Sequence, residues 1–408
     1  MLATLIPMFD EKMMVCAYSI FAQKENYFLN PELIGSARFD GAGHIIGLEI
    51  VDVMGVHILS DDRPIFVPVD QISIYSSIKE QCSAPHEKIV LLIDPSIEPS
   101  ETSIARIKEL KSEGYRFAIR KITLDMFVAY KDILLQMEFC LLDYTKLDMA
   151  KAKILFDKAF PNLKLCAVNI DSREDFDSLR EGGGYSYYEG SFFRLPVNEA
   201  QTEVAPLKIN YIELLNIINK PNFELTDAAD VIGRDVALVV SLLKMVNRMA
   251  VNSEITSVRH AAAMLGQKDL KKWINTAVTK ELCADKPSEI TRVSMQRAKF
   301  AENLAPVFEM GGLSSELFLL GLFSVIDIML DEPMEEALKM VQVSKNIEKA
   351  LLEDEGELAD VLDFIREYEA ASWQEVSRIM LLKNIDMDKV YDAYVDALKW
   401  QRDLLAAS

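Results

Sequence analysis

The sequence predicts an α/β barrel followed by an all-helical domain, and three observations support this. From residue 89 to residue 193, apolar strand candidates alternate with amphipathic stretches, at the spacing of about 25 residues that is typical of βα units. From Pro206 on the strand signal fades, and only six glycines and five prolines, Pro206 included, interrupt the rest of the chain. The length of 408 residues exceeds the size at which a single core stops growing, so we expect two domains.

The strand candidates of the first half are apolar runs with helix-length segments between them. They are Ile89–Ile93, Tyr115–Ile119, Phe139–Leu142, Lys164–Ile170 and Tyr185–Tyr188. Residues 13–22 and 65–74 are further strand or helix candidates. Together these segments would close a barrel of about 200 residues, the low end for that architecture.

Apolar runs of helix length characterise the second half, notably residues 237–246 and 317–330. Ser372 and Glu375 have the spacing of a capping box, which predicts a helix start. The segment Leu195–Lys208 carries two prolines between polar residues and is the expected domain boundary. We therefore expect a barrel at residues 1–200 and a helical domain at residues 206–408.

The composition restricts the partners and the compartment. The 64 acidic and 44 basic residues give a formal charge of −20, which opposes non-specific binding to nucleic acid or anionic lipid. The five cysteines fall in no metal-binding spacing, as is typical of a reducing cytoplasm. No secretory signal opens the chain, and the longest apolar run is shorter than the roughly 20 residues of a membrane span. We expect a cytoplasmic protein whose partners are proteins or small molecules.

Five segments of the first half resemble the EAL domain, a barrel family best known for hydrolysing the bacterial second messenger cyclic di-GMP. They are Lys88–Ile93, Gly114–Ile119, Phe139–Asp143, Leu165–Asp171 and Tyr187–Pro196. The resemblance implies a TIM-like (β/α) barrel with its site at the carboxyl ends of the strands. It also implies that barrels of this kind can form dimers.

The second half resembles the HDOD domain, through the segments Asp235–Asn247, Ile255–Gly266, Arg297–Glu302, Phe318–Ser324 and Tyr368-Glu369. Together the two resemblances cover nearly the whole chain, in the order of bacterial EAL–HDOD signalling proteins. HDOD domains are related in fold to HD phosphohydrolases, whose metal sites need several histidines and an adjacent His-Asp pair. His260 is the one histidine of this half and Ala261 follows it, so we expect no metal site there.

The residues with which EAL enzymes hold two divalent metals, and the lysine that assists the attacking water, are missing from the matching positions of this chain. Carried over residue by residue, those positions fall on Ser19, Pro68, Leu92, Arg120, Lys121, Leu142, Val168 and Glu189. A strand that ends in two cations repels a divalent metal. The resemblance with these departures predicts a pseudoenzyme: a barrel without catalytic activity, metal or other cofactor.

Four carboxylates remain near the predicted strand ends, and two interpretations of them stay open. They are Asp94, Asp143, Asp171 and Glu189. Hard oxygen ligands of this kind suffice for a relocated magnesium or calcium site. The favoured interpretation makes them ion-pair partners of Arg120 and Lys121 or solvated loop residues, because structural ion pairs are the commoner cause of such clusters.

Four polar residues of the second half lie within apolar, helix-like runs, where each needs a partner. They are Asn247, Arg297, Glu302 and Asp327. The favoured interpretation is structural, as caps and buried hydrogen bonds. The alternative is a role in binding a partner.

The predicted function is that of an inactive EAL–HDOD signalling protein that acts by binding other signalling proteins. The lost ligands also argue against cyclic di-GMP as a ligand. Two alternatives stay open. In the first, Arg120 and Lys121 meet the phosphates of cyclic di-GMP in a receptor that does not hydrolyse it. In the second, the leftover carboxylates, with Asp143 among them, serve a divergent phosphodiesterase.

Overall fold

The computed structural model describes residues 1–26, 28, 44–194, 206–220, 222–249, 255–341 and 343–407. The chain divides into two compact units, and neither is continuous in sequence. The first unit comprises Met1–Leu195 and Arg366–Asp392, and the second comprises Pro196–Ile365 and Ala393–Ser408. The linker that we expected at Leu195–Lys208 lies mostly outside the described residues. Within the described residues, no helix is long and apolar enough to cross a membrane.

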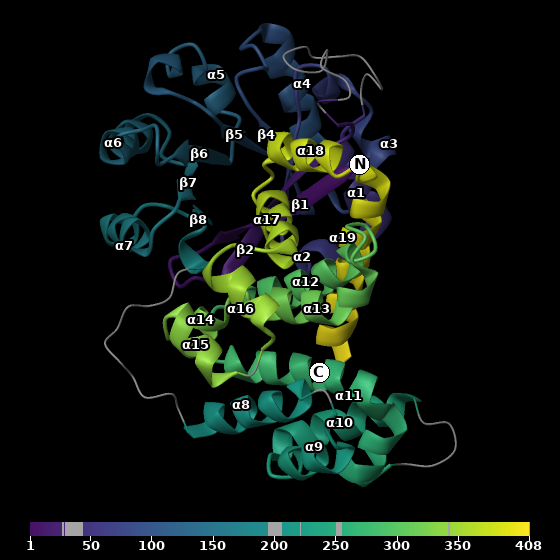
Figure 1. Cartoon of the computed structure of the whole chain (residues 1–408). Coiled ribbons are helices and arrows are strands. Elements are labelled where there is room, and N and C mark those ends of the chain that lie inside the picture. Colours follow the sequence, from purple (N-terminus) through teal and green to yellow (C-terminus); the bar gives the residue numbers. More distant parts are fainter. Residues whose placement is uncertain are drawn as a thin grey trace. The chain divides into compact units, whose positions relative to one another are not determined.

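The first unit contains a closed barrel of eight strands, arranged in sequence order and drawn in purple to teal in Figure 1. The strands are β1 (Leu2–Phe9), β2 (Val15–Gln23), β3 (Ile65–Pro68), β4 (Ile89–Ile93), β5 (Arg116–Arg120), β6 (Phe139–Asp143), β7 (Lys164–Ile170) and β8 (Tyr187–Gly190). Strand β1 runs antiparallel to both of its neighbours, β2 and β8. All pairs from β2 to β8 are parallel.

The predicted barrel is confirmed, with corrections to individual strands. The sequence pattern did not predict β1. Of the ambiguous segments, 13–22 is mostly strand, whereas 65–74 is strand only over its first four residues and then turns into a short 3-10 helix. The antiparallel hairpin of β1 and β2 closes a barrel whose other connections are βα units. The regular βα spacing that predicted the other strands therefore does not predict β1.

Alternate residues of the strands fill the barrel interior, as the two-residue period of a strand requires. The interior cluster consists of Met8, Ala17, Phe66, Val90, Leu92, Ala118, Phe139, Leu141, Cys166 and Val168, with Tyr187 packed against it. On β6, Phe139 and Leu141 therefore face inward, and Leu142 faces the surrounding layer, where it is fully buried. On each parallel strand, the inward-facing position that follows the last member of this cluster lies at the carboxyl end of the barrel.

The helical segments between the strands are short, and several begin at a side-chain cap. The helices are α1 (Ile46–Met54), α2 (Val56–Ser60), α3 (Ile78–Gln81), α4 (Glu101–Ser112), α5 (Lys131–Leu134), α6 (Met149–Ala159) and α7 (Arg173–Gly182), with 3-10 turns η2 (Ser73–Tyr75), η3 (His86–Lys88), η4 (Leu124–Met126) and η5 (Phe192–Arg194). The side chains of Ser100, Asp148 and Ser172 each accept a hydrogen bond from a backbone N–H in the first turn of α4, α6 and α7. These caps satisfy donors that have no partner within the helix.

The rest of the chain is helical, as predicted. Its helices are α8 (Pro206–Asn219), α9 (Leu225–Ile232), α10 (Val236–Met249), α11 (Val258–Leu282), α12 (Ser288–Leu304), α13 (Ser314–Phe323), α14 (Ile326–Leu330), α15 (Met334–Met340), α16 (Lys345–Leu352), α17 (Glu357–Glu369), α18 (Trp373–Leu382) and α19 (Met387–Ala407), with η6 (Gly311–Leu313). The apolar run 317–330 is two helices, α13 and α14, that separate after Phe323. Helix α18 does begin after Ser372, but the expected capping box is wrong. Ser372 makes no cap hydrogen bond, and Glu375 pairs with Arg378 instead.

A segment near the C-terminus belongs to the barrel unit, which differs from the expected division at residues 200 and 206. The hydroxyl of Tyr368 accepts a hydrogen bond from the backbone N–H of Ala3 in β1, at 3.1 Å. At the end of β2, the side-chain amide of Gln23 donates to the Ser377 hydroxyl at 3.0 Å. The last turn of α17, from Arg366, and helix α18 therefore pack against the strand hairpin that is most distant from them in sequence (Figure 1).

Candidate functional site

Charged side chains gather where the parallel strands of the barrel end. Arg120 ends β5, Asp143 ends β6, Glu189 lies one residue before the end of β8, and Asp94 directly follows β4. Each lies two residues beyond a member of the interior cluster, and so continues the inward-facing row of its strand. We refer to Asp94, Arg120, Lys121, Asp143 and Glu189 as the mouth cluster. Active sites of β/α barrels occupy this end of the barrel.

Arg120 is the less exposed of the two cations of the mouth cluster, at 23% against 61% for Lys121. One Nη of its guanidinium lies 3.9 Å from Asp94 Oδ2, and its Cζ lies 5.2 Å from the centre of the Phe21 ring. The Nε atom is buried and has no hydrogen-bond partner among the described residues. Burial lowers the pKa of the guanidinium, against the opposing effect of Asp94 and Glu189. The mouth therefore contains a cation with a hydrogen-bond donor that is not satisfied.

Asp94 is held ionised by its neighbours. Its Oδ2 lies 3.0 Å from Lys121 Nζ, and its Oδ1 accepts a hydrogen bond from the Ser96 N–H at 3.0 Å. Burial alone would raise the pKa of Asp94, but the hydrogen bonds from Ser96 and Lys121 outweigh it and the pKa is lowered. The backbone of Lys121 has φ of +59°. A residue other than glycine held in this conformation is most often found at a site that constrains it.

Glu189 is the buried acid of the mouth cluster. It is 8% exposed, and none of its described neighbours donates a hydrogen bond to its carboxyl group. Burial raises the pKa of Glu189 to about 7, with Arg120 opposing the rise and Asp143 adding to it. A carboxyl group with such a pKa can hold or release a proton near neutral pH, as general acids and bases do.

Asp143 differs from Glu189 because its oxygens are occupied. Its Oδ1 accepts from the N–H and the hydroxyl of Thr145, at 3.0 and 2.6 Å, and its Oδ2 lies 3.1 Å from Lys146 Nζ. Burial acts to raise the pKa of Asp143, but hydrogen bonds from Thr145, Asn169 and Lys146 lower it overall. Asp143 is therefore ionised at neutral pH and adds negative charge beside Glu189.

The positions that we matched to the metal ligands of EAL enzymes lie at different places in the barrel. Leu92 and Val168 belong to the interior cluster, Ser19 is buried with its hydroxyl 3.7 Å from the sulfur of Met8, and Pro68 ends β3. Leu142 faces away from the interior. The inward residues of β6 are Leu141 and Asp143, so Leu142, the position matched to the water-assisting lysine, does not share their face of the strand.

The donor set of the mouth does not fit a centre of two divalent metals. Among the described residues, no group of three or more His, Cys, Asp and Glu side chains is placed to hold a metal ion. Asp94 is paired with two cations, and Asp143 with a third. The remaining carboxylate predicted from the sequence, Asp171, accepts a hydrogen bond from the Ser191 hydroxyl at 3.3 Å.

The polar residues predicted in the helical half are not brought together into one cluster. Asn247 bonds both the N–H and the C=O of Ile255, at 2.7 and 2.9 Å. Glu302 receives Lys272 and Lys299 at 2.7 and 2.8 Å. Arg297 donates to the Ser324 hydroxyl at 3.0 Å, and burial raises the pKa of Asp327, with Arg297 opposing the rise. These contacts hold helices and loops in place.

Two features of the site were missed by sequence reasoning. Phe21 supplies the ring beside Arg120, and Asn169, at φ of +64°, bonds Asp143. Phe21 belongs to the inward row of β2, so a strand pattern over 15–23 would have placed it at the mouth. Asn169 carries no such signal, because it lies on the exposed side of a buried strand.

The comparison with protein families concerns the helical half. Residues 205–361 match the family model of the HDOD domain. This part of the chain is an HDOD domain. The resemblance drawn from the sequence is thereby confirmed, and the matched range ends before the segment that joins the barrel unit.

Curated relatives extend over the barrel as well. The cyclic di-GMP phosphodiesterase CdgJ of Vibrio cholerae is 27% identical over 328 residues, which are 78% of this chain and 74% of that protein. The uncharacterized protein YuxH of Bacillus subtilis is 27% identical over 417 residues, covering 98% of both chains. The expectation that this chain is not an enzyme is contradicted, because a relative with this coverage is named a phosphodiesterase. The absence of the usual metal ligands from positions matched by eye was not sufficient to predict a protein without enzymatic activity.

Solved structures of EAL proteins also align with the chain, at low similarity. The EAL enzyme Bd1971 in its cGMP-bound form is 14% identical with a TM-score of 0.37, and the match covers 46% of this chain and 59% of that one, under two thirds of its length. The EAL domain protein of Listeria monocytogenes is 13% identical with a TM-score of 0.36, over 47% of this chain and 86% of that one. The barrel is defined here by the strand pairing of the chain itself.

Proposed function

We propose that the protein is a cyclic di-GMP signalling protein whose barrel mouth binds the nucleotide through its phosphates. The observation that carries this proposal is Arg120, a half-buried cation at the carboxyl end of β5 with an unpaired Nε. Lys121 adds a second cation, 61% exposed and able to turn from Asp94 toward a ligand. Guanidinium and ammonium groups are the usual partners of phosphate oxygens. The relative named a cyclic di-GMP phosphodiesterase supplies the choice of nucleotide.

Asp94 has a definite role in this arrangement. Its carboxylate lies between the two cations, at 3.9 Å from Arg120 and 3.0 Å from Lys121. Without it, two like charges on adjacent residues would repel each other and swing into water. Asp94 therefore keeps the cations over the mouth, and a bound phosphate would share them with it.

The test is a titration of the full-length protein with cyclic di-GMP, followed by recovery of the nucleotide. We expect binding that weakens as salt increases. Arg120→Gln should weaken it about tenfold or more, as expected for loss of a charge-assisted contact. Lys158→Gln, which removes an exposed lysine on α6, is the matched control and should bind like the wild type. Absence of binding, or equal binding by Arg120→Gln, would refute the proposal.

Hydrolysis of the nucleotide is the second candidate function, and Glu189 is the observation that favours it. A buried carboxyl group with a pKa of about 7 beside Arg120 is suited to move a proton during phosphodiester cleavage. The same titration answers this question, with magnesium or manganese present and the products separated. Turnover that Glu189→Gln abolishes while binding persists would assign the role. If the nucleotide stays intact with either metal, hydrolysis is refuted and binding is the remaining function.

We also propose that the HDOD half makes contacts with other signalling proteins. Its predicted polar residues already bond to neighbouring helices and loops. Contacts with a partner would therefore involve exposed side chains, and not a cluster of buried polar residues. Crosslinking of the full-length protein in its own cells, with Asn247→Ala as a destabilised control, would identify a partner. A partner that crosslinks only to barrel residues would contradict this part of the proposal.

A further inference from the structure

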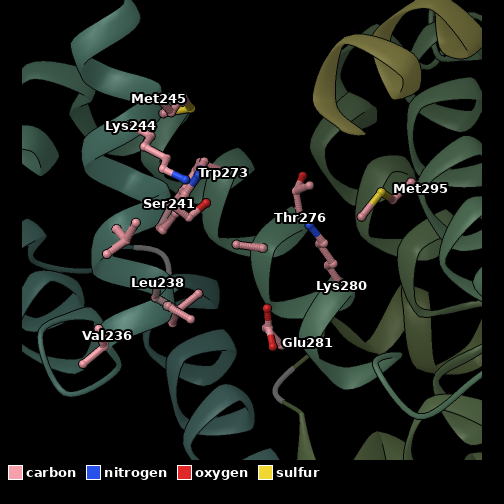
Figure 2. A pocket seen from close by; sticks show the side chains of 13 residues that line it. Val236, Leu238, Ser241, Lys244, Met245, Trp273, Thr276, Lys280, Glu281 and Met295 are labelled. Atoms are coloured by element: carbon pink, nitrogen blue, oxygen red, sulfur yellow. The ribbon is translucent and has the colours of Figure 1, made fainter. Parts of the chain in front are cut away.

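A cavity of about 590 Å³ opens between helices α10 and α11 of the HDOD domain. Its lining side chains come mostly from these two helices, and Met295 of α12 completes one side (Figure 2). The volume lies within the range of cavities that hold small organic ligands. Neither the family match nor the sequence patterns identified this cavity. Its residues have the spacing that is typical of any helix face that packs against another helix. It lies wholly within one compact unit and is independent of the barrel mouth.

The body of the cavity is apolar. Leu238, Trp273 and Met295 are 3%, 7% and 1% exposed and form its buried wall. At the open side, Val236 and Val240 lie one helical turn apart on α10 and are 79% and 45% exposed. An apolar stripe next to an apolar cavity favours a ligand that removes both from water.

Two lysines give the cavity its charge. Lys244 comes from α10 and Lys280 from α11, and within the described residues neither makes an ion pair or a hydrogen bond. Figure 2 shows Lys244 and Ser241 on one side of the cavity, and Thr276 and Lys280 on the other. Both lysines are exposed in a chain that carries a formal charge of −20. They differ from Lys272 of the same helix α11, which is paired with Glu302.

One acidic residue, Glu281, belongs to the described lining. Figure 2 shows it toward the end of the cavity that lies away from Lys244. The two lysines and this one carboxylate leave a net positive charge in the cavity. The same cavity therefore offers a positive charge and a buried apolar wall, a combination that suits an amphipathic molecule.

We propose that this cavity binds a small amphipathic anion, with an apolar body against Trp273 and Met295 and a carboxylate or phosphate group between Lys244 and Lys280. An anion is favoured over a neutral ligand because the lining carries two cations and one carboxylate, and a negative group is attracted to the cations. A compact ligand is favoured over a protein helix because the wall residues Leu238, Trp273 and Met295 are at most 7% exposed, which leaves little surface for the side chains of a helix.

The experiment uses the three tryptophans of the chain as reporters. Full-length protein with labelled indole nitrogens is titrated with sodium decanoate and, separately, with decyltrimethylammonium as the cation of equal chain length. The indole signal of Trp273, assigned with Trp273→Phe, should move with decanoate and not with the ammonium probe. The signals of Trp373 and Trp400 should stay in place, since neither lines the cavity.

Three variants make the test specific. Lys244→Gln combined with Lys280→Gln should weaken decanoate binding about tenfold, as for loss of charge-assisted contacts. Lys268→Gln, an exposed lysine of α11 outside the cavity, should bind like the wild type. Ala277→Leu, which fills the cavity with an apolar side chain on a helix, should abolish the response. An unmoved Trp273 signal, an equal response to the cationic probe, or full binding by Ala277→Leu would each overturn the proposal.

Discussion

Two glutamates, Glu189 buried in the barrel unit and Glu302 half-buried in the HDOD domain, show how differently the chain treats a carboxyl group that is withdrawn from water. Glu302 in the HDOD domain is bonded by Lys272 and Lys299, at 2.7 and 2.8 Å. Burial would raise its pKa, but those hydrogen bonds lower it. Glu189 in the barrel has no described hydrogen-bond donor, and burial raises its pKa to about 7. A buried charge with its partners supplied is part of the packing, whereas one without them is available to a ligand or a proton.

The largest expected effect tests whether helix packing holds the Glu302 contacts together. Gly321 of α13 lies so close to α12 that an added Cβ would be 2.4 Å from the carbonyl oxygen of Arg297. Gly321→Ala must move α13 away from the helix that carries Glu302, and we expect a loss of about 3 kcal/mol in the free energy of unfolding. Urea unfolding measures it. Gly312→Ala is the control, since its Cβ would meet nothing within 4 Å. Equal stability of the two variants would show that the packing is looser than the structure indicates.

The next effect is the pH dependence that Glu189 imposes on stability. Its folded pKa of about 7 lies above its ordinary value of 4.5, so between these values the folded state binds more protons than the unfolded state. The stability from this group is full below about pH 4.5 and is lost as the pH rises to about 7. Glu189→Gln should remove that slope, so that its advantage over the wild type grows to about 3 kcal/mol at pH 8.

Unfolding in urea at pH 5 and pH 8 measures this change. Glu181→Gln is the matched control on the same unit, because Glu181 is exposed and its replacement should leave the slope intact. If wild type and Glu189→Gln lost stability in parallel with pH, Glu189 would be solvated or paired, and the contrast between the two glutamates would fail.

The smallest effect concerns Glu302. Glu302→Gln keeps the shape of the side chain but removes the charge that faces Lys272 and Lys299, which are partly exposed. We expect a loss of about 1–2 kcal/mol, reduced by salt, with no change in the binding of cyclic di-GMP. Glu348→Gln on the exposed side of α16 is the control and should cost little. A Glu302 variant that unfolds normally but no longer binds the nucleotide would assign a ligand role to the HDOD cluster instead.

The candidate site was only partly predictable from the sequence. Arg120, Lys121, Asp94 and Glu189 were all singled out as strand-end residues, and their pairing was the favoured interpretation. The register of β6 was not predictable by eye, because Leu141 and Leu142 are equally apolar and only the interior packing distinguishes them. The cavity of the HDOD domain also had no sequence signal. Its lysines look like those of any exposed helix face until the neighbouring helix is in place.

By itself, the sequence determined the order of barrel and helical domain and most of the strands. These follow from local patterns, which repeat every two or 3.6 residues and do not depend on distant partners. Only the tertiary structure decided that β1 closes the barrel in antiparallel pairing, that residues 366–392 join the barrel unit, and that Glu189 is enclosed. Each depends on contacts between residues far apart in the chain. Such contacts are set by which surfaces can be buried together, and no local pattern records that choice.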